Sequence, residues 1–158
     1  MNYLIEWFAV VPPITRMYLL ISIGLSLGVL FELITPLKLY FNWSLIWNKY
    51  QYWRLVTPLF YLGEFSTYLL IDLYIIKSYS SRLEKHEFRN KPAEYIVFLT
   101  FGSINFLIAA YFLKLNFMSN CTSCMMMYFW SRKNPNIVAN IYFIHLRACF
   151  VPYFWLMI

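Results

Sequence analysis

Ser123 and the two histidines, His86 and His145, are the candidates for covalent catalysis in this sequence. A serine hydroxyl becomes a nucleophile only when a base lies beside it. His86 stands in a basic polar stretch, and His145 stands in an interrupted apolar segment near the C-terminus. Isolated serine and histidine matches of this kind are usually accidental, so the sequence predicts no catalytic residue and no enzyme.

Cys121 and Cys124 form a C-x-x-C pair, which invites a metal or redox interpretation. A structural zinc site takes four ligands, and the sequence offers no second cysteine or histidine pair at a suitable spacing. Two cysteines one turn apart on an apolar helix are more often packing residues. We therefore expect neither a metal ion nor any other cofactor.

Arg54 follows Trp53 at the edge of an apolar run, in the stretch N-K-Y-Q-Y-W-R-L-V-T-P-L-F-Y-L-G. An arginine at the centre of a membrane costs about 2.5–3.5 kcal/mol on insertion scales, and less near the edge. Two interpretations are open. Arg54 either snorkels to the surface and marks a helix end, or it folds back and fixes the preceding loop through main-chain or carboxylate partners, with Trp53 wedged below it. Glu32 is one candidate carboxylate.

Glu64 and Asp72 are acidic residues in an otherwise apolar run, eight positions apart. On one helix this spacing places them on roughly similar faces, and ionisable groups within membrane spans usually face a bundle interior or a water-filled cavity. Together with Glu32 they are candidates to line a hydrated groove for a polypeptide. The slightly favoured alternative is that Glu64 lies at the interface and Asp72 pairs locally, for example with Lys77.

The elements that position these residues are strongly apolar. Of 158 residues, 61% are hydrophobic and 13% are charged, whereas soluble domains carry about a quarter charged residues. A protein surrounded by membrane lipid is therefore expected. The net charge of +6 is spread over short segments between apolar runs. That distribution is typical of membrane topology signals and not of a nucleic-acid-binding patch.

The sequence predicts an all-α, polytopic membrane protein with a single domain over residues 1–158. A span needs about 20 apolar residues, and the apolar runs give four spans and a partial fifth, at about 17–36, 59–76, 95–113, 115–130 and 137–158. The segment 37–58, rich in tyrosine and tryptophan, is expected at the outer membrane interface, and 78–94 forms a basic inner loop. With the N-terminus in the cytosol, eight lysines and arginines fall inside and four outside, which predicts that orientation.

Several long motifs follow one another in register. In chain order they are P-P-I-T-R at 12–16, F-N at 41–42, Q-Y-W-R-L-V-T-P-L-F-Y-L-G at 51–63, L-Y-I-I-K-S-Y-S-S-R-L-E-K-H-E-F at 73–88, Y-F-W-S-R-K-N-P at 128–135 and R-A-C-F-V-P-Y at 147–153. In this order and spacing the chain resembles the Derlin family, inactive members of the rhomboid superfamily, over essentially its whole length.

The resemblance implies a rhomboid-like helical bundle in the endoplasmic reticulum membrane. It implies a non-catalytic role in returning misfolded proteins to the cytosol for ubiquitin-dependent degradation, with Trp53-Arg54 in a lumenal loop that contributes to substrate handling. Ser123 lacks the flanking glycines of the rhomboid G-x-S-G motif, so an active intramembrane serine protease is a disfavoured alternative. A Derlin-like role in protein import across the outer membrane of a secondary plastid stays open.

The resemblance also implies partners: membrane lipid, misfolded client proteins and other membrane subunits, such as a ubiquitin ligase complex or a Derlin paralogue. Derlins have six spans and often a cytosolic tail that docks a AAA ATPase. This chain stops at Ile158, within the fifth predicted segment. We therefore expect an apparently truncated Derlin, and three alternatives stay open: a naturally short Derlin, a gene model cut early, or a decayed paralogue. A short form would need a partner chain to complete its bundle, and its contact with the ATPase is expected to be indirect.

Overall fold

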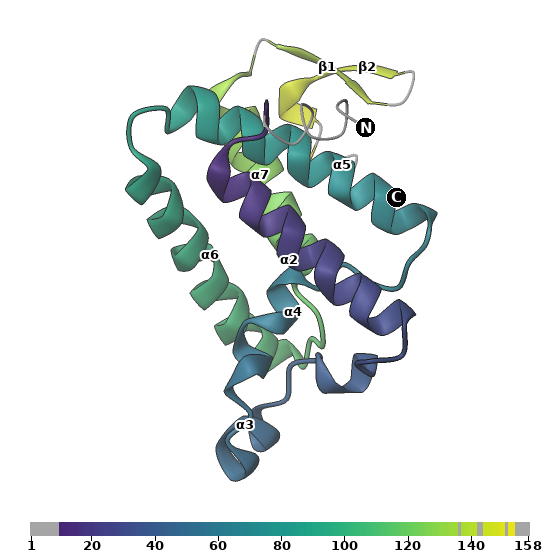
Figure 1. Cartoon of the computed structure of the whole chain (residues 1–158). Coiled ribbons are helices and arrows are strands. Elements are labelled where there is room, and N and C mark those ends of the chain that lie inside the picture. Colours follow the sequence, from purple (N-terminus) through teal and green to yellow (C-terminus); the bar gives the residue numbers. More distant parts are fainter. Residues whose placement is uncertain (1–9, 136, 142–143, 151, 154–158) are drawn as a thin grey trace.

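The computed structural model describes residues 10–135, 137–141, 144–150 and 152–153, which form a helical bundle with a short β-hairpin at one end (Figure 1). The longer helices are α2 (Pro13–Leu30), α5 (Thr67–Arg82), α6 (Pro92–Leu113) and α7 (Ser119–Lys133). The shorter ones are η1 (Pro36–Lys38), α3 (Trp43–Lys49), η2 (Tyr52–Leu55), α4 (Thr57–Phe60), the π-helix η3 (Leu83–Glu87) and η4 (Ala148–Phe150). The predicted all-α class is confirmed, with the hairpin as a small addition.

Among the described residues, two helices, α2 and α6, are long and apolar enough to cross a membrane by length and composition. At 1.5 Å per residue, the 18 residues of α2 measure about 27 Å and the 22 residues of α6 measure about 33 Å. The 16 residues of α5 and the 15 of α7 are shorter, at about 24 Å and 22 Å. α7 packs against α4, α5 and α6, so it is the central helix of the bundle.

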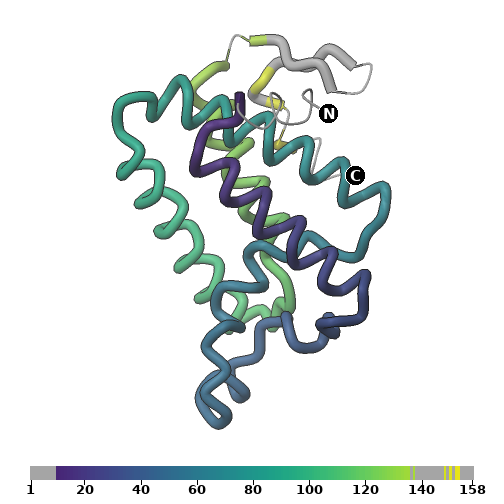
Figure 2. Tube along the Cα trace, viewed as in Figure 1, coloured from purple at the N-terminus to yellow at the C-terminus, as the bar shows by residue number. Residues whose placement is uncertain are grey.

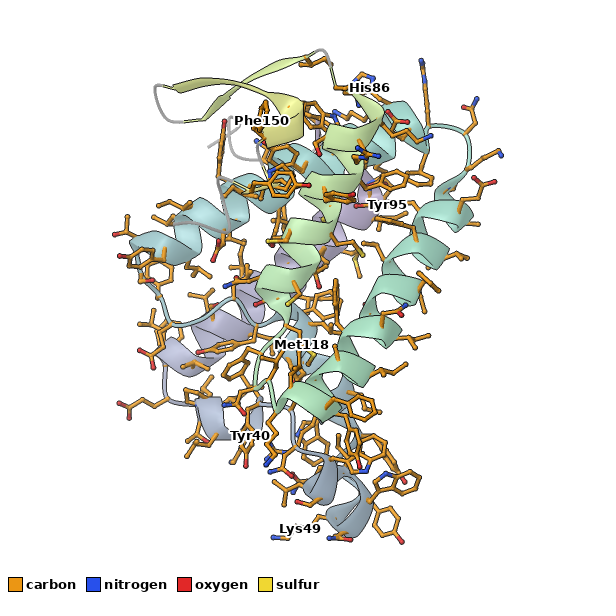
Figure 3. The ribbon with its side chains drawn as sticks, turned by 180° about the vertical axis from the view of Figure 1, so that it is seen from behind. Tyr40, Lys49, His86, Tyr95, Met118 and Phe150 are labelled. Carbon is orange, nitrogen blue, oxygen red and sulfur yellow. The ribbon has the colours of Figure 1, made fainter. Side chains whose placement is uncertain are left out.

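Two clusters of buried apolar side chains lie at different levels of the bundle. The larger one joins α2, α5, α6 and α7 through residues such as Tyr18, Ile76, Tyr95 and Trp130. The smaller one collects Phe41, Ile46, Leu59, Ala110 and Met118, so it packs the interfacial segment against the end of α6 and the start of α7. Figure 3 shows Tyr95 nearer to the end that carries His86 and Met118 nearer to the end that carries Lys49.

The second predicted span, 59–76, differs from the observed structure at its start. α4 ends at Phe60, the chain then runs without helix over residues 61–66, and α5 begins at Thr67. Gly63 lies at φ 124°, a conformation that is open to glycine and breaks a helix. The Ser66 hydroxyl then accepts a bond from the Leu69 N–H, so a new helix starts with its own N-cap.

The structure also differs from the partial fifth span expected over residues 137–158. There the described residues form strands β1 (Val138–Ile141) and β2 (Ile144–Arg147), which pair antiparallel with Ala139 opposite Leu146, followed by η4. The segment is rich in valine and isoleucine, which favour strands. It also carries Asn140, His145 and Arg147, which a membrane-spanning helix would bury at a cost.

The segment between α2 and α5 is folded into short helices at the end of the bundle away from the hairpin (Figure 2). Glu32, just after α2, adopts φ 56°, which turns the chain out of the helix. Asn42 caps α3 by accepting a bond from the Leu45 N–H at 3.2 Å, and Tyr50 in the left-handed conformation ends α3. The interfacial segment is therefore ordered by caps and turns of its own.

Candidate functional site

Arg54 lies in η2 and is 5% exposed. Its Nη1 donates to the main-chain carbonyls of Leu37 at 3.0 Å and Tyr40 at 2.9 Å, and its Nε donates to the Gln51 side chain at 2.7 Å. The guanidinium carbon also lies 4.8 Å from the centre of the Tyr40 ring, which is cation–π distance. We call Arg54 with Leu37, Tyr40 and Gln51 the Arg54 clasp.

The Arg54 clasp exists because the chain around η1 forms no regular ladder of hydrogen bonds. Carbonyls in such a segment need partners when they are shielded from water. Arg54 supplies two of them. The Thr57 hydroxyl lies 3.0 Å from both the Leu39 and the Trp53 carbonyls and donates its one proton between them. An arginine suits this task because its planar fork offers five N–H donors in fixed directions.

Main-chain bonds connect the clasped loop to the rest of the bundle. The Phe41 N–H donates to the Asn116 carbonyl at 2.9 Å, and the Met118 N–H donates to the Pro58 carbonyl at 3.0 Å. Phe41 and Met118 also belong to the same buried cluster. The loop that Arg54 folds is thereby docked on the α6–α7 connection.

Two details of the predicted arrangement around Arg54 are wrong. Trp53 does not lie below Arg54, because its side chain is 53% exposed. In a 3₁₀-helix consecutive side chains point about 120° apart, so burying Arg54 turns Trp53 outward. Glu32 is exposed and is not among the partners of Arg54, whose bonds go to carbonyl and amide oxygens.

Glu64 and Asp72 do not share a helix. Glu64 is exposed in the non-helical segment before α5, whereas Asp72 is half-buried one turn inside α5. The eight-residue helical spacing that placed them on similar faces therefore does not apply, because the break at Gly63 separates them. That Glu32, Glu64 and Asp72 line a common groove stays a prediction.

A second buried charge, Glu84, lies at the end of the bundle opposite to the Arg54 clasp. It is 7% exposed and belongs to the π-helix η3. One carboxylate oxygen accepts from the Ile14 N–H at 3.0 Å, and the other accepts from the Thr15 N–H at 2.9 Å and the Thr15 hydroxyl at 2.8 Å. These N–H groups belong to the first turn of α2, where the helix leaves donors unpaired and favours a negative charge.

A chain of hydroxyl groups extends this arrangement across the bundle. Thr15 and Ser80 lie 2.7 Å apart, and Ser80 and Tyr95 also lie 2.7 Å apart, measured between hydroxyl oxygens. Each hydroxyl has one proton. Because Thr15 donates to Glu84, Ser80 must donate to Thr15 and Tyr95 to Ser80. We call Glu84, Ile14, Thr15, Ser80 and Tyr95 the Glu84 clasp; it joins α2, α5, η3 and α6.

Sequence reasoning missed the Glu84 clasp, although Glu84 and Thr15 stand within two of the motifs quoted above. One signal was available. α2 begins P-P-I-T-R, and neither Pro12 nor Pro13 can cap the helix with a side-chain oxygen. A helix start without a local cap calls for a partner from elsewhere, but the sequence does not say which acidic residue supplies it.

The candidates for catalysis and metal binding are not assembled into a site. Ser123 is buried on α7 and its hydroxyl donates to the Ser119 carbonyl of the same helix at 3.2 Å. His86 lies on η3 at the Glu84 end, and the side chain of His145 falls outside the described part of the chain. Cys121 and Cys124 are half-buried free thiols on α7, and no group of three metal-ligating side chains occurs among the described residues.

Hydroxyl-bearing side chains lie inside the bundle, and many large apolar side chains lie on its outer surface. α2 buries Thr15, Tyr18, Ser22 and Ser26 along one face, while large apolar side chains such as Met17, Leu20 and Leu30 are exposed. α6 exposes apolar side chains along most of its length. Apolar side chains on the outside and hydroxyl-bearing side chains on the inside are typical of a helical bundle surrounded by lipid. The fold therefore defines a multi-pass helical membrane protein.

Comparisons with known proteins agree with this class. The family model described as the Der1-like family matches residues 11–158. The "Probable derlin-2 homolog" of Dictyostelium discoideum is 33% identical over 155 residues, which cover 94% of this chain and 60% of that protein. Derlin-2.2 of Arabidopsis thaliana is 35% identical over 144 residues, with 84% and 59% coverage, and Derlin-1.1 of Zea mays is 32% identical over 156 residues, with 97% and 64% coverage.

The chain belongs to the Der1-like family, as the resemblance of its motifs predicted. It spans 59–64% of the length of these three curated relatives.

Proposed function

We propose that this chain is a non-catalytic Derlin factor that helps misfolded proteins leave the endoplasmic reticulum for ubiquitin-dependent degradation. The observation that carries the proposal is the Arg54 clasp in a chain of the Der1-like family. A loop with a fixed shape offers clients the same surface at every encounter, because little ordering is left to do on binding. Trp53, exposed beside the clasp, supplies a large amphipathic contact.

The proposed orientation has the Arg54 clasp in the lumen and the Glu84 clasp in the cytosol. Basic residues support it. Six of them lie at the end of α5, in η3, before α6 and at the end of α7, namely Arg82, Lys85, Arg89, Lys91, Arg132 and Lys133. Lysine and arginine accumulate on the cytosolic side of membrane proteins.

The proposed role needs no covalent chemistry. Ser123 donates its hydroxyl proton to a carbonyl of its own helix, and within the described part of the chain no base is bonded to it, as activation would require. Membrane thinning is a second physical contribution to the proposed role. Helices of about 22–24 Å, such as α5 and α7, are shorter than a hydrocarbon core of about 30 Å, and such a mismatch draws the bilayer thinner.

The proposed partners are misfolded clients, membrane lipid and other membrane subunits such as a ubiquitin ligase complex or a Derlin paralogue. Contact with the cytosolic AAA ATPase is proposed to be indirect, through those subunits.

Complementation of cells that lack their own Derlins tests the proposal. The chain, Trp53→Ala and Arg54→Ala are expressed at equal levels, and the half-life of a misfolded reporter is followed after synthesis is stopped. The unchanged chain is expected to shorten the half-life of the reporter relative to cells without a Derlin. With either variant the half-life is expected to be longer than with the unchanged chain, although both variants still insert in the membrane. If both variants clear the reporter at the rate of the unchanged chain, the motif is only an anchor and the proposal fails.

A further inference from the structure

Two exposed cations stand where α5 and α7 end, at the end of the bundle that carries His86 (Figure 3). Arg82 lies in the last turn of α5, and Lys133 lies in the last turn of α7. The two helices pack against each other. Cations are common at the ends of membrane helices, so their presence alone identifies no ligand.

Aromatic rings hold both cations in place. The Arg82 guanidinium carbon lies 5.0 Å from the centre of the Trp130 ring and 5.8 Å from that of the Tyr79 ring. The Lys133 ammonium nitrogen lies 5.9 Å from the centre of the Phe129 ring. All three are cation–π distances. Phe129 and Trp130 are consecutive on α7, and Lys133 follows them by one turn, so the two cations lie on neighbouring rings.

The ring contacts leave the hydrogen-bond donors of both cations available. The Tyr79 and Trp130 rings are buried, whereas Arg82 and Lys133 are exposed. The described residues give neither cation a hydrogen-bond acceptor or a carboxylate partner. A guanidinium carries five N–H donors and an ammonium carries three. The pair therefore offers positioned donors to a ligand from outside the chain.

The carboxylates of the same end are bonded to other groups. Glu84 is buried against the start of α2, and Glu94 pairs with Lys91. Glu87 accepts from the amide of Asn134, the residue that ends α7, at 3.3 Å. Glu87 is thus the acid of these three that lies beside the two cations. One carboxylate against two cations leaves a net positive charge, which favours an anion.

We infer that Arg82 and Lys133 form a binding site for the phosphate group of an anionic lipid. Phosphate oxygens accept paired bonds from the arginine fork, and a lysine adds a point charge. A lipid is the source that fits, because α5 and α7 end here at the membrane surface, where basic clusters bind anionic headgroups. The inference goes beyond the proposed function and agrees with the proposed orientation, since the cytosolic leaflet carries anionic lipids.

Native mass spectrometry of the full chain, purified in detergent and stripped of lipid, tests the site. Phosphatidic acid and phosphatidylcholine with the same acyl chains are added in equal amounts, and the ratio of the two lipid complexes is measured. The unchanged chain should prefer phosphatidic acid by at least about fivefold. Arg82→Gln and Lys133→Gln should each lower the preference by about fivefold, which is the effect of one cation near an anionic headgroup.

Two kinds of variant serve as controls. Glu87→Gln keeps an acceptor for Asn134 and removes the negative charge beside the site, so the preference should rise above that of the unchanged chain. Lys49→Gln and Lys114→Gln, which remove exposed cations outside the site, should leave the preference unchanged.

Three results would overturn the site. They are the absence of a preference in the unchanged chain, a preference that survives both Arg82→Gln and Lys133→Gln, and equal losses in Lys49→Gln and Arg82→Gln. The measurement involves no client and no degradation, so any of these results leaves the proposed function to its own test.

Discussion

In the part of the chain that the structure describes, two charged side chains are buried at opposite ends of the bundle, and both bind main-chain groups. Arg54 gives protons to carbonyls of the interfacial loop, and Glu84 receives protons from N–H groups at the start of α2. Each charge thus has the sign that its unpaired main-chain groups require. Figure 3 shows Tyr40 of the one clasp and Tyr95 of the other far apart.

The two clasps differ in how far along the chain their partners lie. Arg54 bonds residues that are 3, 14 and 17 positions away, so its clasp holds one loop together. Glu84 bonds residues 69 and 70 positions away, and Thr15 reaches Ser80 across 65. The Glu84 clasp therefore holds separate helices in place. We infer a division of labour between the two clasps. The Glu84 clasp maintains the packing of the helices, and the Arg54 clasp maintains the shape of the loop that is proposed to contact clients.

Glu84→Ala is expected to have the largest effect. It leaves two N–H groups of α2 and one end of the hydroxyl chain without a partner, and buried bonds to a charged group are worth about 1.5–3 kcal/mol each. We expect a loss of about 3 kcal/mol in the free energy of unfolding, measured by SDS titration in detergent micelles. Glu94→Ala is the matched control, because Glu94 pairs with Lys91 on the surface and such pairs contribute about 0–1 kcal/mol. Equal losses of stability in Glu84→Ala and Glu94→Ala would mean that the buried bonds of Glu84 do not stabilise the bundle.

Arg54→Ala is expected to lower the global free energy of unfolding by about half as much as Glu84→Ala does, because the carbonyls that lose Arg54 can reach water when the loop opens. Its main effect should be local: limited proteolysis should cut within residues 37–58 at least several-fold faster. Arg54→Lys should behave like Arg54→Ala, since a lysine lacks the planar fork. Lys49→Ala, an exposed cation on α3, serves as control. If Arg54→Lys is as resistant to protease as the unchanged chain, the loop does not depend on the planar guanidinium group of Arg54.

Tyr95→Phe removes the outermost donor of the hydroxyl chain and nothing else. Ser80 keeps Thr15 as its partner, so the expected loss is about 1 kcal/mol, the usual value of one neutral hydrogen bond. Tyr18→Phe is a comparable control, because the Tyr18 hydroxyl bonds to the Leu59 carbonyl outside the clasp. Combined with Glu84→Ala, Tyr95→Phe should cost less than it does alone, since members of one network are not additive. Full additivity in the SDS titration would mean that the two groups do not share a network.

Trp53→Ala is expected to have the smallest effect on stability, below about 0.5 kcal/mol, because the side chain is mostly exposed. Its effect on client turnover should nevertheless resemble that of Arg54→Ala. This contrast separates contact with clients or lipid from maintenance of the loop. A Trp53→Ala protein that is as unstable as Glu84→Ala in the SDS titration would instead show that Trp53 is structural.

The sequence was sufficient to predict the helical membrane class and the family; a functional role for Arg54 stays a prediction. The main-chain partners of Arg54 matched one of two interpretations that the sequence left open. An arginine at the edge of an apolar run can either fold back onto the protein or snorkel to the membrane surface, and residue type does not decide between them. The Glu84 clasp could not be predicted, since its bonds to Ile14 and Thr15 at the start of α2 join residues that are 65–70 positions apart along the chain.

The alternative in which Asp72 and Glu64 share a helix differs from the structure because a glycine conformation, which hydropathy does not reveal, interrupts the second span. The favoured alternative, with Glu64 at the interface and Asp72 paired locally, stays a prediction.

Hydrogen exchange followed by mass spectrometry tests the division of labour most directly, on the unchanged chain, Arg54→Ala and Glu84→Ala in the same detergent. The account predicts that Arg54→Ala speeds exchange within residues 37–58 and leaves α2, α5 and α6 protected. Glu84→Ala should speed exchange in all three of those helices. If both variants expose the same segments, the two ends are not independent, and the central claim is wrong.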